Sequence, residues 1–136
     1  MDIIIGWQEY TTEFNGEQIS MQLRPLTRKG FLLLSPHMGI FQAYAKKEQV
    51  DGLAAQTGLF ELQGVCRELF QTHLKGLVGF TVNGKEPRIE DLTEESIFAT
   101  LCTDIVGKLF TISILDRADS KNSEGQSINL IDSEAI

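Results

Sequence analysis

The sequence predicts an α+β domain, mostly helical, in which an N-terminal β-hairpin is followed by helices and by a flexible polar C-terminal tail. Three observations predict it. Apolar and polar residues alternate around an Asn-Gly pair near the N-terminus, apolar residues then recur at three- and four-residue steps, and a run of small polar residues follows Arg117. The length of 136 residues suits one domain, which we place at residues 1–117, with a mobile tail at 118–136.

The hairpin is predicted for residues 1–26, with its turn at Asn15-Gly16, because both of these residues tolerate the positive φ of a type I′ turn. Pairing the strands about this turn sets Tyr10 opposite Met21 and gives one apolar and one polar face. Trp7 falls on the polar face, where it either covers the start of the sheet or marks a partner contact. The hairpin is therefore expected to be a half-buried antiparallel pair.

Four helices are predicted after the hairpin, each beginning at a residue that can cap it. They span 27–34 with Thr27 as the cap, 35–47 with Ser35 before Pro36, 51–74 with Asp51, and 93–117 with Thr93. The last helix carries an apolar stripe from Ile97 to Leu115 that we expect to be buried. Residues 76–92 break the helical pattern and are predicted to form a short extended piece, a turn at Asn83-Gly84 and an ordered loop.

Composition limits the partners and the compartment of the chain. The formal net charge of −7 is opposite in sign to that of a protein that neutralises nucleic-acid phosphates. No window approaches the roughly 20 consecutive apolar residues of a membrane-spanning helix. The N-terminus lacks the basic and apolar regions of a signal peptide. We therefore expect a cytoplasmic protein that binds neither nucleic acid nor membrane, and whose cysteines, Cys66 and Cys102, are free thiols in the core.

The negative charge is concentrated in the second half of the chain. Residues 76–136 contain 11 acidic and 5 basic side chains, whereas residues 1–75 contain 8 and 7. This asymmetry is typical of a solvated acidic surface, and the alternative is a docking surface for a basic partner.

The residue types that carry chemistry form no recognised catalytic or metal-binding pattern. The candidate metal ligands are His37, His73, Cys66 and Cys102, and no two of them have the spacing of a zinc motif. Both cysteines lie in apolar stripes, where burial disfavours a reactive thiolate. The acidic residues Glu90, Asp91, Glu94 and Glu95 lie at a predicted helix start, where the helix dipole accounts for them. We predict no enzyme activity, no metal and no cofactor, and the many large apolar side chains favour an interaction protein.

Several short segments, taken together, carry a family resemblance. They are Leu23–Phe31, His73–Phe80, Asn83–Pro87, the acidic run Glu90–Glu95 and the Lys-Asn ending of Asp119–Asn122. In this order they resemble the small tail assembly chaperones of tailed phages and prophages, over roughly residues 20–122. The resemblance implies a mostly helical protein without catalytic equipment. It also implies binding of an aggregation-prone tape-measure protein until tail-tube protein polymerises around it, and self-association into a homo-oligomer in the host cytoplasm.

A chaperone of this kind needs exposed apolar surface on a soluble body. We predict that the partner-binding residues lie on the two long helices, with the hairpin aromatics as a second group. They are Phe60 and Phe70, Phe98, and Trp7 and Tyr10. Two alternative functions are a structural or accessory phage tail protein, and a small-molecule-binding regulatory domain with a pocket between the hairpin and the helices.

Overall fold

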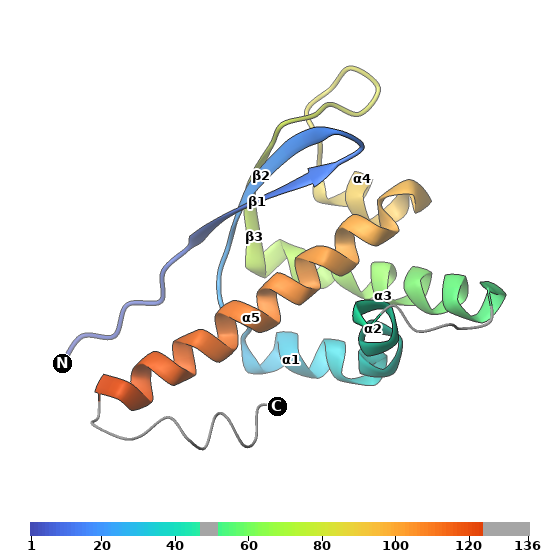
Figure 1. Ribbon diagram of the computed structural model, residues 1–136. Helices are drawn as coiled ribbons and strands as arrows, with labels where there is room; N and C mark the ends of the chain where they lie inside the picture. The colour runs from blue at the N-terminus through green and yellow to red at the C-terminus, as the bar shows by residue number, and fades with distance from the viewer. Residues whose placement is uncertain (47–51, 124–136) are drawn as a thin grey trace.

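A three-stranded antiparallel sheet and two long helices dominate the computed structural model, which describes residues 1–46 and 52–123 (Figure 1). The elements in chain order are β1 (Gln8–Phe14), β2 (Glu17–Leu23), α1 (Arg28–Leu34), the 3-10 turn η1 (Ser35–His37), α2 (Met38–Ala45), α3 (Gly52–His73), β3 (Leu74–Val78), α4 (Ile89–Glu94), the 3-10 turn η2 (Ser96–Phe98) and α5 (Ala99–Ser123). The sheet lies on one side of α5, and α1 with α2 lies on the other (Figure 1). The α+β class and the order of hairpin before helices are confirmed.

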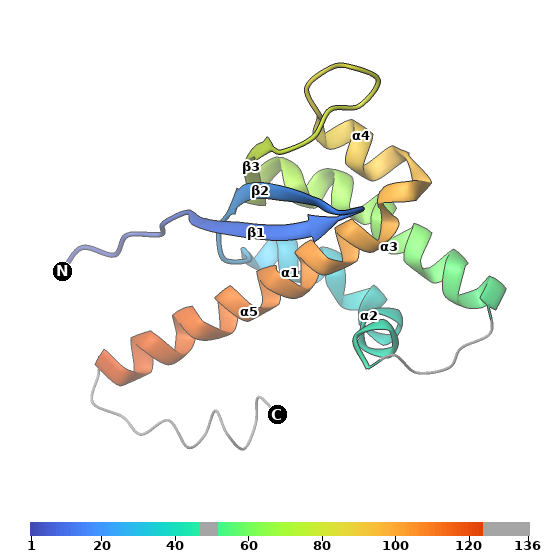
Figure 2. The ribbon, with the colours of Figure 1, turned by 45° about the horizontal axis from the view of Figure 1, so that its top comes forward.

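The N-terminal hairpin has the predicted register. Tyr10 pairs with Met21, and Thr12 pairs with Ile19. The turn residues Asn15 and Gly16 have φ values of 53° and 82°, which is the left-handed region that a type I′ turn requires. Exposure alternates along both strands, so that one face of the hairpin is packed on the helices and the other faces solvent. Figure 2 shows the residues before β1 running away from the sheet.

A third strand extends the sheet, which was predicted as a two-stranded hairpin with only an extended piece further along the chain. β3 starts directly after α3 and pairs antiparallel with β2, with Leu74 opposite Leu23 and Val78 opposite Ser20. β2 is therefore the central strand. Gly79, the residue after β3, has a φ of +114° and lies close against β2. A Cβ atom at this position would collide with the backbone of Gln18.

The hydrophobic core lies between the inner face of the sheet, α3 and α5. Its fully buried members include Ile19, Met21, Leu23, Leu62, Leu69, Phe70, Leu101, Ile105, Leu109 and Ile112. Cys66 and Cys102 are buried in this core as free thiols, as predicted. Both long helices, α3 and α5, therefore contribute their apolar faces to the core.

The chain from α1 to α2 is almost continuously helical. Thr27 is the N-cap of α1, as predicted, and its hydroxyl accepts a hydrogen bond from the Gly30 amide. The prediction that Ser35 caps the next helix is wrong. Ser35 has helical φ and ψ of −54° and −42°, and its amide donates to the carbonyl of Phe31. Because the chain does not leave the helical region at Ser35, this residue continues the first helix instead of starting a second.

The start of the last helix differs from the predicted cap at Thr93. A separate short helix, α4, begins after Arg88, and Thr93 lies buried inside it with its hydroxyl donating to the Ile89 carbonyl at 2.9 Å. Glu95 is extended, with ψ of 123°, and separates α4 from η2. Ile97, predicted to be buried, is 67% exposed on η2, and its neighbour Phe98 is the residue of this turn that is buried.

The C-terminal boundary also differs from the prediction. α5 continues to Ser123, so residues 118–123 of the predicted tail are its last turns. In both views these turns extend beyond the sheet (Figures 1 and 2). The rest of the predicted tail, residues 124–136, and the predicted helix ends at Lys47 and Asp51 lie outside the described residues.

One helical stretch is long and apolar enough to cross a bilayer by length and composition alone. It is Ser96–Ser113, within the part of the chain that the structure describes, and half of it is buried inside the domain. Its buried residues pack with those of α3 and the sheet, as in the core helix of a soluble protein.

Candidate functional site

The buried histidine at the end of α3 is held by hydrogen bonds between both of its ring nitrogens and the backbone. His73 is 1% exposed, its Nδ1 donates to the Leu69 carbonyl at 2.9 Å, and its Nε2 accepts from the Thr27 amide at 3.0 Å. Burial lowers the pKa of His73, although the hydrogen bond to Leu69 opposes this shift, and the positive charge of Arg24 lowers the pKa further. The imidazole is therefore neutral near pH 7, with both nitrogens engaged.

The two cysteines are neighbours in the core but are poorly suited to nucleophilic chemistry. The Cys102 thiol donates to the Leu92 carbonyl at 3.2 Å. Hydrogen bonding with Cys102, followed by burial, raises the pKa of the Cys66 thiol well above its usual range. A protonated buried thiol is a weak nucleophile.

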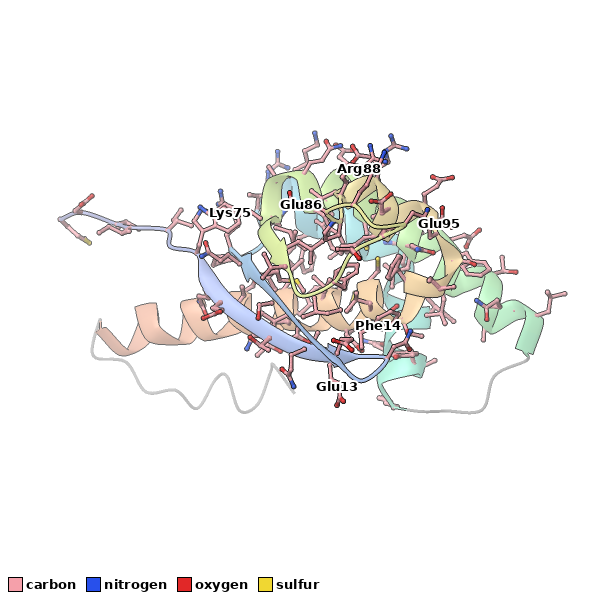
Figure 3. All side chains as sticks on the ribbon, turned by 90° about the horizontal axis from the view of Figure 1, so that it is seen from above. Glu13, Phe14, Lys75, Glu86, Arg88 and Glu95 are labelled. Carbon is pink, nitrogen blue, oxygen red and sulfur yellow. The ribbon has the colours of Figure 1, made fainter. Side chains whose placement is uncertain are left out.

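Two further polar side chains, those of Gln63 and Asp91, form hydrogen bonds that stabilise the fold. Gln63 is 4% exposed, and its amide nitrogen donates to the carbonyls of Leu92 at 2.8 Å and Glu95 at 2.7 Å. Asp91 accepts from the Arg88 amide at 3.0 Å, and hydrogen bonds from Arg88 lower the pKa of this carboxyl group. Figure 3 shows Arg88 at the outer edge of the molecule. Over residues 1–46 and 52–123, no three His, Cys, Asp or Glu side chains gather as metal ligands.

Of the five predicted partner-binding residues, two are in the core. Phe70 is 0% exposed and Phe98 is 4% exposed, so the structure corrects their assignment to a partner surface. Phe98 lies with its ring centroid 5.5 Å from that of Phe14 and 5.7 Å from that of Phe80. Figure 3 shows Phe14 at the closed end of the hairpin. The helical period identifies an apolar stripe but does not tell which of two apolar flanks faces inward.

The other three predicted residues lie at or near the surface. Trp7 is 38% exposed, with the Lys75 ammonium 4.3 Å from its ring centroid. Tyr10 is half-buried, and the Lys108 ammonium lies 5.7 Å from its ring. Phe60, on α3, is 40% exposed. Trp7 directly precedes β1 and Tyr10 lies on it, whereas Phe60 belongs to α3.

An apolar groove between α1 and α5, which the sequence did not predict, is bordered by the exposed side chain of Phe31. This α1–α5 groove has a volume of about 470 Å³ and is lined by Leu26, Thr27, Arg28, Phe31, Met38, Phe110 and Ser113. Phe31 is 47% exposed, and its neighbour Leu32 is 55% exposed. The Phe31 and Phe110 rings meet edge to face with centroids 6.1 Å apart, and the Phe41 ring packs against Phe110 at a centroid distance of 5.6 Å.

The polar atoms in the groove wall are already satisfied by the fold. Ser113 Oγ accepts from the Leu26 amide at 2.8 Å and donates to the Leu109 carbonyl at 2.7 Å. The Thr27 amide donates to His73, and the Thr27 hydroxyl caps α1. A ligand in the groove therefore meets mainly apolar surface.

Arg28 supplies the charge at this groove. Its neighbour Lys29 forms an ion pair with Glu68 at 2.9 Å, whereas Arg28 forms none with any described residue. A cation at the edge of an apolar groove favours a ligand that carries both apolar and acidic groups.

One sequence signal points to this groove. Phe31–Leu34 is a run of four consecutive apolar residues in a helix of seven. Four consecutive residues of a helix span more than one face, so one helix side cannot bury them all. Leu34 is buried, and Phe31 and Leu32 are exposed. The position of Phe110 opposite Phe31 comes from the tertiary fold.

Comparison with known proteins gives no match to this chain among protein-family models, curated proteins or solved structures.

Proposed function

We propose that this protein is a non-catalytic, tail assembly chaperone-like protein that binds an apolar segment of an aggregation-prone partner. The observation that carries the proposal is the α1–α5 groove, an apolar depression of about 470 Å³ edged by exposed Phe31 and by Arg28. Grooves of this kind accept the apolar face of an amphipathic helix. The net charge of −7 keeps a protein with such surface soluble.

The family resemblance supplies the class of partner and the compartment. A tape-measure-type protein is long and exposes apolar helical segments before its tube is assembled, and its chaperone would act in the host cytoplasm. Self-association belongs to the same proposal. Exposed apolar residues outside the groove are the surfaces that we expect a homo-oligomer to use, and they include Ile3, Ile4, Ile5, Leu53 and Ile97.

The groove favours a protein partner over a small metabolite. The hollow between the hairpin and the helices, lined by Phe14, Phe80, Ile97 and Phe98 among others, has a volume of only about 210 Å³. Ligand pockets are usually about 300–1,000 Å³ and enclose most of their ligand. The larger α1–α5 groove is within this range of volume, but it is open to solvent along Phe31, which is 47% exposed, and an open apolar groove suits a peptide segment better than an enclosed metabolite.

Co-expression with the products of neighbouring genes tests the proposal. The wild-type protein should raise the soluble yield of a long helical neighbour and co-purify with it. Phe31→Asp should lower that yield at least tenfold, because it places a charge in the groove. Phe60→Asp is the matched control, since Phe60 is similarly exposed but lies on α3.

Two outcomes would contradict the proposal. If wild-type protein leaves every neighbouring product insoluble, the chaperone function fails. If Phe60→Asp abolishes solubilisation and Phe31→Asp does not, the binding surface lies on α3 and the groove is not the site.

A further inference from the structure

The residues before β1 form an exposed apolar arm. Ile3, Ile4 and Ile5 are 76%, 81% and 59% exposed, and a Cβ atom at Gly6 would have no neighbour within 4 Å. Figures 1 and 2 both show this N-terminal arm, residues 1–6, running away from the sheet. Its own fold therefore leaves three consecutive large apolar side chains in water, and burying them against another surface is favourable.

The α1–α5 groove offers an apolar surface on the same chain. We propose that the N-terminal arm of one copy docks into the α1–α5 groove of a second copy, which returns its own arm, so that a two-fold dimer forms. The inference rests on the proposed function in treating the groove as a binding site for apolar segments. It adds that a second copy occupies this site and that an external partner must displace the arm.

The arm begins at the same end of the molecule as the groove. Gln8, the first residue of β1, pairs with Leu23, the last residue of β2. The groove-lining residue Leu26 follows three residues later, at most about 11 Å further along the chain. Residues 1–6 extend to about 20 Å at 3.3 Å per residue. Two copies that face each other at this end can therefore exchange both arms across one two-fold axis.

The direction of the arm favours the groove of a second copy over that of its own chain. Trp7 directly follows the arm, and the Lys75 ammonium lies 4.3 Å from its ring centroid. The arm leaves the sheet outward from this contact (Figure 2). Docking into its own groove would require the chain to reverse direction next to Trp7, whereas exchange uses the direction that the arm already has.

The charges of the arm and the groove are complementary. Asp2 precedes the three isoleucines, and Arg28 lines the groove without an ion-pair partner among the described residues. Arg28 lies three residues before Phe31 on α1, so the two side chains share a face of this helix. An arm with Ile3 against Phe31 therefore carries Asp2 toward the guanidinium of Arg28.

Sedimentation of the full-length chain tests the exchange. Successive side chains of an extended segment point to opposite sides, so Ile3 and Ile5 enter the groove together. Wild-type protein should form a dimer that dissociates on dilution. Ile3→Asp with Ile5→Asp should raise the dimer Kd by about tenfold or more, because it places charges in an apolar interface.

The other side of the arm provides the matched control. Ile4→Asp with Gly6→Asp adds the same two charges to the same segment and keeps Ile3 and Ile5, so the dimer Kd should stay within about threefold of wild type. Circular dichroism should be unchanged in both double variants, since all four positions lie outside the helices and strands. Equal weakening of the dimer in both would overturn the proposal, as would a wild-type chain that is monomeric at every soluble concentration.

A mixture of two charge variants tests whether the arm enters a second copy. Asp2→Lys and Arg28→Glu should each weaken the dimer when alone, because each arm then meets a groove of like charge. Mixed in equal amounts, the two variants should recover the wild-type Kd as a heterodimer, because each arm then meets a groove of opposite charge. A mixture that associates no better than the separate variants would assign the arm to its own groove or to no groove, and would overturn the proposal.

These measurements need no external partner, so they separate this inference from the proposed function. A dimer that responds to the variants as expected but solubilises no neighbouring product would contradict the proposed function alone. A monomeric chain that solubilises a neighbouring product through Phe31 would contradict the exchange of arms alone.

Discussion

The two faces of α1 have opposite properties although the helix has only seven residues. On the face toward α3, Gly30 is buried, and a Cβ atom there would lie 2.7 Å from His73 Cε1. On the other face, Phe31 is 47% exposed and borders the α1–α5 groove. A helix this short is not stable by itself. We call the face of α1 that packs on α3 its tight face, and the face that borders the groove its open face. Packing of the tight face positions the open face, so the geometry of the groove depends on contacts outside the groove.

His73 is the centre of the tight face. Its Nε2 holds the Thr27 amide at the start of α1, and its carbonyl accepts from the Arg24 amide at 3.2 Å. Leu69, which accepts from His73 Nδ1, is also close to Gly30. His73 is thus a positioning residue for the groove, and it lies outside the groove lining.

The largest expected effect is at Gly30. Gly30→Ala should lower the free energy of unfolding by about 1–3 kcal/mol, because overpacking forces neighbours to move. The His73 ring cannot yield easily, since both its nitrogens are hydrogen-bonded to the backbone. Urea unfolding followed by circular dichroism measures the change.

Gly64→Ala is the control for Gly30→Ala. Gly64 is an exposed residue of α3, and a Cβ atom there would have no neighbour within 4 Å. This variant should gain up to about 1 kcal/mol from helix propensity alone. Equal stability changes in the two variants would show that α1 is not tightly packed on α3.

The second effect is a pH dependence of stability. Because burial lowers the pKa of His73 in the folded state, its contribution is complete above the unfolded-state pKa near 6.5 and is lost as pH falls toward the folded pKa. Protonated Nε2 cannot accept from the Thr27 amide. Urea unfolding between pH 7.5 and pH 5 should therefore show stability falling with pH.

His73→Gln should remove much of that slope and lower stability at pH 7.5 by about 1–2 kcal/mol, through the unsatisfied Thr27 amide. His37→Gln, at the half-buried residue on η1, is the control for a histidine substitution outside the contact with the Thr27 amide. A wild-type slope in the His73→Gln variant would assign the acid sensitivity to other groups.

Local sequence signals were sufficient where neighbouring residues determine the structure. The Asn15-Gly16 turn correctly predicts the whole register of the hairpin, and the type and position of Thr27 correctly predict a cap. Local signals do not predict β3 as part of the sheet, because it follows α3 without a turn and its partner β2 lies some fifty residues earlier. Pairing of this kind depends on where α3 returns the chain.

Competing local signals explain the error at the last helix. Thr93 and the acidic residues after it form a plausible helix start, but Arg88 and Asp91 already cap α4 five residues earlier. The α1–α5 groove has a different origin. It joins residues as distant in sequence as Leu26 and Ser113, so its existence was not predictable from periodicity.

The smallest expected effect is at the open face. Phe31→Ala should lower stability by less than about 1 kcal/mol and leave the far-ultraviolet circular dichroism unchanged, because nearly half of this side chain is already in water. Phe110→Ala should cost more, since Phe110 is half-buried and contacts both Phe31 and Phe41. Urea unfolding of the single and double variants gives the coupling between Phe31 and Phe110, which should be about 0.5–1.5 kcal/mol for an edge-to-face pair. A loss of more than about 2 kcal/mol for Phe31→Ala would indicate a core contact. In that case both faces of α1 would be packed against the domain, and the groove would belong to the hydrophobic core instead of forming a surface that can bind a ligand.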